Sequence, residues 1–126
     1  MADTPKILPP TLRDKKRYLA FEIISERPVT FENVIEAFWS SLLSFLGEVG
    51  TSRTNVWFVK DAWDSSRQRG LVRCEHTEVD NVRVALALIT GVAGARVVPH
   101  SLGVSGTMDG ARKKFLGERT LKDFTE

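Results

Sequence analysis

Arg17-Tyr18-Leu19-Ala20-Phe21-Glu22-Ile23-Ile24-Ser25 alternates in side-chain character from one residue to the next. Leu19, Phe21 and Ile23 share one face of an extended chain, and the residues between them share the other. Because successive side chains of a strand point to opposite faces, this period of two predicts a β-strand over residues 17–25. Pro28, which has no backbone N–H donor, is expected to end it.

The segment after Pro28 changes to the period of an α-helix. Thr30 is a residue type that caps helix N-termini well. The apolar side chains that follow recur at helical spacing: Phe31, Val34, Ile35, Phe38, Leu42, Phe45 and Leu46. Gly47 and Gly50 are expected to end the helix.

This apolar stripe is wider than one packed face needs, because Trp39 and Leu43 lie beside it. Deep burial of the whole helix is one interpretation. The other is that the margin of the stripe binds a protein partner. The candidate residues of that partner interface are Phe38, Trp39, Leu42 and Leu43.

The rest of the chain predicts three more strands and two more helices. Strands are expected at residues 56–59, 71–74 and 95–104. A polar hairpin loop at 64–70 separates the first two of these. Thr77 is a candidate cap for a second helix, and Gly91 lies beyond its end. A third, short helix is marked by Met108, Ala111 and Phe115.

The order strand, helix, strand, strand, helix, strand, followed by an added helix, is the split βαβ pattern. We therefore expect an α+β fold, an RRM-like or ferredoxin-like βαββαβ sandwich with an antiparallel four-stranded sheet and an extra C-terminal helix. Right-handed crossovers place both main helices on one face, so the other face binds a ligand or is covered by the third helix. The expected organisation is an extended arm at 1–12, the RRM-like domain at 13–117 and a polar tail at 118–126.

The 126 residues carry a net charge of only +2, but the charges are unevenly distributed. Residues 6–17 hold five cations and one anion, whereas residues 31–49 hold three glutamates and no cation. A basic side suits the binding of nucleic acid. The simpler alternative is a charged surface that contacts only solvent. With Cys74 as the single cysteine, no apolar run that could cross a membrane and no secretory signal, we expect a cytoplasmic protein.

Two basic clusters flank the predicted sheet. One precedes the first strand, and the other follows Leu102-Gly103-Val104-Ser105-Gly106-Thr107, where a helix start offers free N–H groups to phosphate oxygens. The candidate RNA-binding residues are Lys15, Lys16, Arg17, Arg67, Arg69, Arg73, Gly106, Thr107, Arg112, Lys113 and Lys114. Gly106 and Thr107 fit an ordinary capped turn without a ligand equally well.

Other chemistry is less favoured by the sequence. The strand at 71–74 has no aromatic residue for base stacking, and Trp57 and Trp63 are interpreted as packing residues. His76 and His100 have no cluster of metal ligands near them in sequence, so no protein active site is expected. Cys74 is interpreted as a small core residue.

Several segments, in the same order, resemble the ribonuclease P protein component 2 family, and together they span residues 8–117. The similar segments are Leu8–Ile23, Gly70–Cys74, Val79–Arg83, Leu102–Thr107 and Lys113-Lys114-Phe115. Relatives often have further basic residues after Ser-Gly-Thr, where this chain has Met108-Asp109-Gly110-Ala111. Without those further basic residues, this turn has fewer cations with which to contact RNA.

The resemblance implies an RNA-binding subunit of ribonuclease P, the ribonucleoprotein that cleaves the 5′ leader from precursor tRNA. It also implies that the RNA carries out hydrolysis with Mg²⁺, while the protein binds no cofactor or metal. The implied partners are ribonuclease P RNA, precursor tRNA, ribonuclease P protein component 3, other protein subunits and a second copy of the chain. A ferredoxin-like small-molecule enzyme or regulatory domain and a ribosomal or other RNA-scaffold protein are the alternatives.

Overall fold

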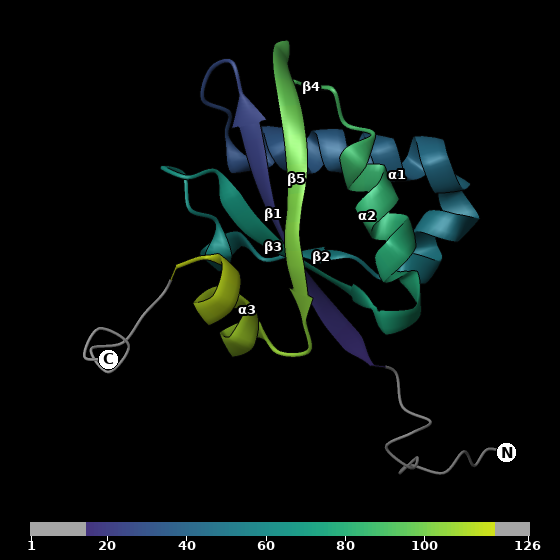
Figure 1. Ribbon diagram of the computed structural model, residues 1–126. Helices are drawn as coiled ribbons and strands as arrows, with labels where there is room; N and C mark the ends of the chain where they lie inside the picture. Colours follow the sequence, from purple (N-terminus) through teal and green to yellow (C-terminus); the bar gives the residue numbers. More distant parts are fainter. Residues whose placement is uncertain (1–14, 118–126) are drawn as a thin grey trace, which may run out of the picture.

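The computed structural model describes residues 15–117, so the predicted arm at 1–12 and the tail at 118–126 lie outside the described residues (Figure 1). The elements in chain order are β1 (Lys16–Ser25), α1 (Phe31–Thr54), β2 (Trp57–Phe58), η2 (Lys60–Ala62), β3 (Arg69–Glu75), η3 (His76–Glu78), α2 (Val79–Ala87), β4 (Gly91–Val92), β5 (Ala95–Ser105) and α3 (Met108–Phe115). Across this range, no helix combines the length and the apolar character needed to span a membrane.

The strands form one antiparallel sheet in the order β2-β3-β1-β5-β4. β1 is central, and its Leu19 pairs with Val72 of β3 and Val104 of β5. The expected ferredoxin-like α+β fold is confirmed, although the sheet has five strands rather than four. The extra strand β4 has only two residues and pairs with the start of β5. A strand that short has no period from which it could be predicted.

The main hydrophobic core lies where α1 and α2 cover one face of the sheet (Figure 1). Leu19, Phe21 and Ile23 of β1 are all buried there, as their alternation predicts. Phe38 and Leu42 of α1 are fully buried in the same core. Their predicted place in an exposed partner interface is therefore wrong, because the centre of the apolar stripe faces the sheet.

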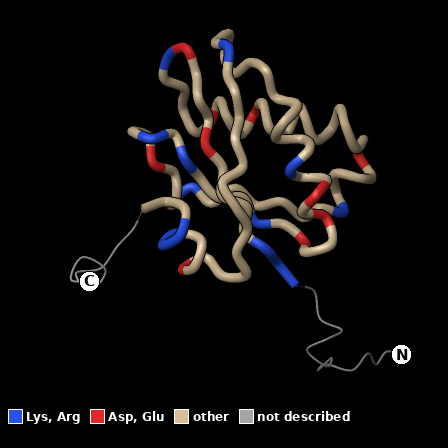
Figure 2. Tube along the Cα trace, viewed as in Figure 1, with Lys and Arg blue, Asp and Glu red and all other residues tan. Residues whose placement is uncertain are grey.

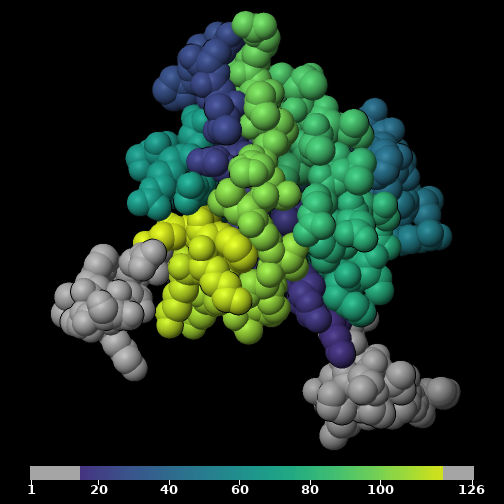
Figure 3. Space-filling model, viewed as in Figure 1, coloured from purple at the N-terminus to yellow at the C-terminus, as the bar shows by residue number. Residues whose placement is uncertain are grey.

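α3 covers part of the opposite face and closes a second, smaller core. Ala20 and Leu71 of the sheet belong to this core together with Ala111 and Leu116 from the α3 segment. Figure 3 shows α3, in yellow, packed against the green strand β5. The third helix thus covers this part of the face that α1 and α2 leave open.

α1 is longer than the sequence predicts. Thr30 caps it as expected, and its hydroxyl accepts a backbone N–H at 3.2 Å. Gly47 interrupts the helical backbone with φ 73° and ψ 179°, but the helix resumes and ends at Thr54. Gly47 thus breaks the helix as predicted, whereas Gly50 does not end it, because a second helical piece continues to Thr54.

α2 begins after a 3₁₀ turn and not at the predicted cap. Thr77 lies inside η3, and the N-cap position of α2 is Glu78, whose side chain makes no capping hydrogen bond. The core face is nevertheless the predicted one, since Val82 and Ala85 are fully buried.

Candidate nucleic-acid interface

The turn that leads into α3 is closed by its own side chains. The Thr107 hydroxyl accepts the N–H of Gly110 at 3.0 Å and so caps the helix. The N–H of Thr107 donates to the Ser105 hydroxyl at 3.3 Å. Gly106 is exposed, with open space where a side chain would project. In this structure Gly106 and Thr107 therefore have the arrangement of a capped turn.

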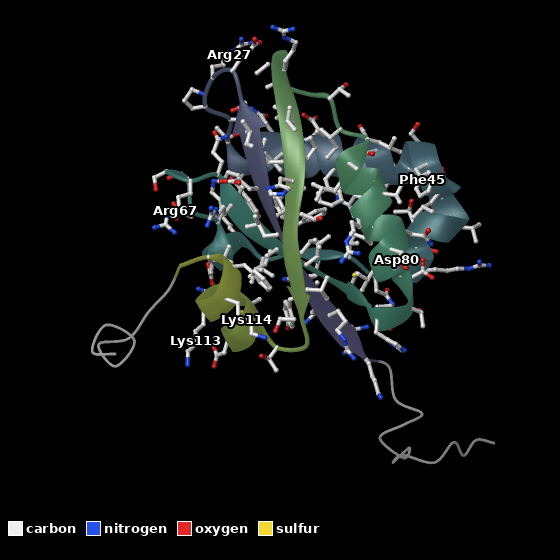
Figure 4. The ribbon with its side chains drawn as sticks, in the orientation of Figure 1. Arg27, Phe45, Arg67, Asp80, Lys113 and Lys114 are labelled. Carbon is white, nitrogen blue, oxygen red and sulfur yellow. The ribbon has the colours of Figure 1, made fainter. Side chains whose placement is uncertain are left out.

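The three cations of α3 lie in its last turn, where positive charge favours the helix dipole. Lys113 and Lys114 are exposed and project from α3 at the lower left of Figure 4. Neither forms an ion pair with an acidic side chain of residues 15–117. Arg112 is partly buried and lines a hollow beside Trp57 of β2. These side chains leave α3 in different directions.

The predicted loop arginines meet the C-terminal end of α3. Arg69 Nε lies 3.2 Å from Glu22 Oε2, and its Nη1 donates to the carbonyl of Phe115 at 3.2 Å. Arg67 lies next to Gly117, and its Nε is 3.9 Å from Asp64 Oδ2. Arg69 thus holds α3 in place and carries a neutralised charge, whereas Arg67 remains more than half exposed.

Asp64 organises the loop that carries Arg67. A hydrogen bond from the Ser66 hydroxyl, at 2.8 Å, lowers the pKa of the Asp64 carboxyl below its usual value. The same oxygen also accepts the N–H groups of Ser66 and Arg67. The loop is therefore preorganised by an acidic side chain close to its arginine.

The basic cluster at the start of β1 is partly neutralised. The Lys16 ammonium donates to the buried carboxylate of Glu75, which also accepts a hydrogen bond from Asn55 at 2.9 Å. The Lys16 hydrogen bond, followed by that of Asn55, lowers the pKa of the Glu75 carboxyl. Arg17 donates to the Lys16 carbonyl at 2.9 Å, and Lys15 is exposed.

Both basic clusters lie at the same end of the sheet. Tyr18 of β1 pairs with Ser105 at the end of β5, immediately before α3. In Figure 2 the basic start of β1 and the basic segment of α3 both occupy the lower half of the view. The antiparallel pairing of β1 with β5 therefore brings residues 15–17 and 112–114 to one end of the molecule.

A row of side chains crosses three strands on the α3 side of the sheet. Arg73 of β3 pairs with Tyr18 of β1 on one side and with Trp57 of β2 on the other. The Arg73 guanidinium carbon lies 5.7 Å from the centroid of the Trp57 ring, a cation–π contact. Trp57 is 62% exposed, so its predicted packing role is wrong, whereas Trp63 packs against Phe21 as predicted.

The exposed apolar surface of α1 lies on the other side of the sheet. Trp39 and Leu43 are 39% and 46% exposed, and the Trp39 ring contacts Phe58 of β2. Phe45 and Val49 are also exposed on this helix. Phe45 belongs to the predicted apolar stripe but lies outside its packed face, and Val49 follows the bend at Gly47.

Cys74 is a buried residue of β3, as predicted. Burial raises the pKa of its thiol to about 11, so the sulfur stays protonated at neutral pH. Within residues 15–117, no group of three or more histidine, cysteine, aspartate or glutamate side chains is placed to hold a metal ion.

The chain is similar to ribonuclease P protein component 2 of Thermococcus kodakarensis, with 44% identity over 118 residues that cover 94% of this chain and 97% of that protein. The identity to component 2 of Methanothermobacter thermautotrophicus is 42%, over 88% of this chain and 93% of that protein. A chain in the cryo-EM structure of yeast ribonuclease MRP shares the fold, with a TM-score of 0.59, 12% identity and coverage of 74% of this chain and 75% of that one. The sequence model of the Rpp14/Pop5 family matches residues 17–116. By this match and these identities, the chain belongs to the Rpp14/Pop5 family.

Proposed function

We propose that this protein is the component 2 subunit of ribonuclease P and assists the RNA that removes the 5′ leader from precursor tRNA. The observation that carries this proposal is the identity of 42–44% to ribonuclease P protein component 2 sequences over at least 88% of the chain. The part of the chain that this similarity covers includes elements on both faces of the sheet, among them α3. The hydrolysis, with its Mg²⁺, belongs to the RNA in this proposal.

RNA binds the end of the molecule where the two basic clusters lie. Lys15, Lys113 and Lys114 are its exposed cations, and they suit phosphate oxygens through counterion release. Arg67 is also exposed, but its loop lies beside the other end of β1. Lys16 and Arg69 are paired with buried or half-buried carboxylates, so they contribute less to phosphate binding. The RNA-binding surface is therefore smaller than the full set of basic residues in the sequence.

Component 3 binds the exposed margin of α1 in this proposal. Trp39 and Leu43 offer apolar area on the side of the sheet opposite α3, and Val49 of the same helix is also exposed. Large apolar side chains exposed together on a helix are typical of protein interfaces. RNA and the protein partner thus occupy different faces of the sheet. In this proposal the complex also contains further subunits and copies of the chain, and it functions in the cytoplasm.

The test is cleavage of precursor tRNA by the cognate ribonuclease P RNA at low Mg²⁺, with component 3 present. Adding this protein is expected to raise the cleavage rate and to lower the Mg²⁺ concentration that half-maximal cleavage requires. If neither quantity changes, the protein is not the functional component 2. Co-purification with ribosomal RNA in place of ribonuclease P RNA would indicate a ribosomal scaffold protein instead.

A further inference from the structure

We propose that a single unstacked nucleobase of the bound RNA stacks on the open face of Trp57, in the hollow between β2 and α3. This inference rests on the proposed function, because it names a contact within the RNA complex. It assigns to the edge strand β2 the role that the central strands have in typical RRM domains, whose aromatic residues stack two or three bases.

α3 covers the middle of the central strands β1 and β3 on this face. Ala20 and Leu71 are fully buried beneath α3, and Phe115 rests directly on Gly103. Trp57, one strand further out, is 62% exposed on the same face. A base that approaches this face therefore finds an indole ring at the edge of the sheet, beyond the margin of α3.

The hollow beside Trp57 has room for one base. Its volume is about 280 Å³, and it is lined by Trp57, Phe58, Val59, Lys60, Asp61, Met108 and Arg112. Pockets for whole small-molecule ligands start at roughly 300 Å³, so this space suits a single planar group. Met108 supplies a thioether, which makes favourable contacts with aromatic rings. The apolar lining, with two cations and the single acid Asp61, leaves a net positive charge that suits a base attached to a phosphate chain.

The Trp57 ring is held in place before RNA arrives. One face of the indole is covered by the Arg73 guanidinium, which leaves the other face for a ligand. The next residue, Phe58, anchors β2 in the core by packing on Phe38 with ring centroids 5.2 Å apart. The N–H of Val59 donates to the carbonyl of Leu71 at 3.0 Å. Little side-chain freedom is therefore lost when a base stacks.

Arg73 adds a positive charge on the covered face of the Trp57 ring. Its Nε is buried and has no hydrogen-bond partner among the described residues. A buried polar atom without a partner is unusual in a native structure, because an unmade hydrogen bond costs free energy. The guanidinium then serves both as a support for the indole ring and as a positive charge beside the RNA.

The test uses the full-length protein with short single-stranded oligoribonucleotides of adenine, cytosine or uracil, and with ribonuclease P RNA. Tryptophan fluorescence and equilibrium binding are followed for the wild type, Trp57→Ala and Trp57→Phe. Trp57→Ala is expected to weaken RNA binding roughly five- to 150-fold, with the salt dependence unchanged because no phosphate contact is lost. Trp57→Phe keeps a stacking ring, so it is expected to retain affinity but to lose the fluorescence quenching that RNA causes.

Trp39→Phe is the matched control, because Trp39 lies on the other side of the sheet and should remain uninvolved in quenching. Wild-type affinity of Trp57→Ala, or full quenching in Trp57→Phe, would overturn the nucleobase site. If Lys113→Ala with Lys114→Ala still weakens binding in that case, the proposed function stands and only this inference fails. A loss of component 3 binding by Trp57→Ala with RNA binding intact would assign the hollow to a protein and also overturn the inference.

Discussion

At the residue scale, Gly103 has a packing role that its place in a glycine-containing motif does not indicate. The segment Leu102–Thr107 suggests a phosphate-binding turn, but Gly103 lies within β5 beneath the Phe115 ring. A Cβ at this position would overlap ring atoms of Phe115. The glycine is therefore required for the close approach of α3 to the sheet.

Gly103→Ala is expected to lower the free energy of unfolding by roughly 1–3 kcal/mol, because the added methyl group overpacks the contact with Phe115. Urea denaturation measures this loss. Gly106→Ala is the matched control, since nothing lies within 4 Å of its Cβ. Phe115→Ala should make Gly103→Ala less costly, so additive effects of the two changes would contradict the proposed contact.

Glu75 makes the stability of the protein depend on pH. Its pKa is lower in the folded state than its ordinary value of 4.5, through the hydrogen bonds from Lys16 and Asn55. The unfolded state therefore binds more protons in acid, and the stability that Glu75 contributes is present above about pH 4.5. It is lost as the pH falls through the folded-state pKa.

Glu75→Gln is expected to cost about 1–2 kcal/mol at pH 7 and to flatten the decline in stability below pH 4.5. The decline is measured by urea denaturation at several pH values. Glu36→Gln, at an exposed position of α1, serves as the comparison and should leave the profile unchanged. A decline of wild-type steepness in Glu75→Gln would mean that other carboxylates account for it.

At the scale of elements, α1 shows what a helical period can and cannot predict. Its buried stripe up to Leu42 follows the predicted spacing. The chain then bends at Gly47, and the Thr51 hydroxyl donates to the carbonyl of Leu42 at 3.0 Å across the bend. Thr54, at the end of the second helical piece, is fully buried. These contacts stabilise a helix beyond the glycine, where sequence rules predict an end.

Gly47→Ala is expected to destabilise the protein by roughly 1–3 kcal/mol, because φ 73° with ψ 179° is a backbone region that only glycine adopts readily. Space is not the cause, since nothing lies within 4 Å of a Cβ at Gly47 or at Gly106. Gly106→Ala, without a positive φ, should change stability by less than about 0.5 kcal/mol. Equal thermal midpoints for the two variants would exclude backbone strain at the bend.

At the scale of the whole molecule, the sheet separates two surfaces of different character. One bears α3 with Lys113, Lys114 and the hollow beside Trp57. The other bears the exposed α1 residues Trp39 and Leu43. Because the two surfaces lie on opposite faces of the sheet, changes on one should leave the other intact.

Lys113→Ala with Lys114→Ala is expected to reduce the slope of the logarithm of RNA affinity against the logarithm of salt concentration by roughly 0.7 per lost contact. Binding of component 3 should be unaffected. Trp39→Ala with Leu43→Ala should show the reverse, with component 3 binding at least tenfold weaker and RNA binding unchanged. Titrations of each double variant with each partner measure both. Simultaneous loss of both partners by either variant would contradict separate surfaces.

The sequence by itself determined the element types, the buried faces of β1 and α1, and the ferredoxin-like order, because side-chain period follows from backbone geometry within a few residues. Only the tertiary structure decided which charges remain available. Lys16 is paired with Glu75, 59 positions away, and Arg69 with Glu22, 47 positions away. The exposure of Trp57 likewise depends on how far α3 extends over the sheet. Ion pairing and solvent access arise from contacts between residues distant in sequence, for which local patterns carry no signal.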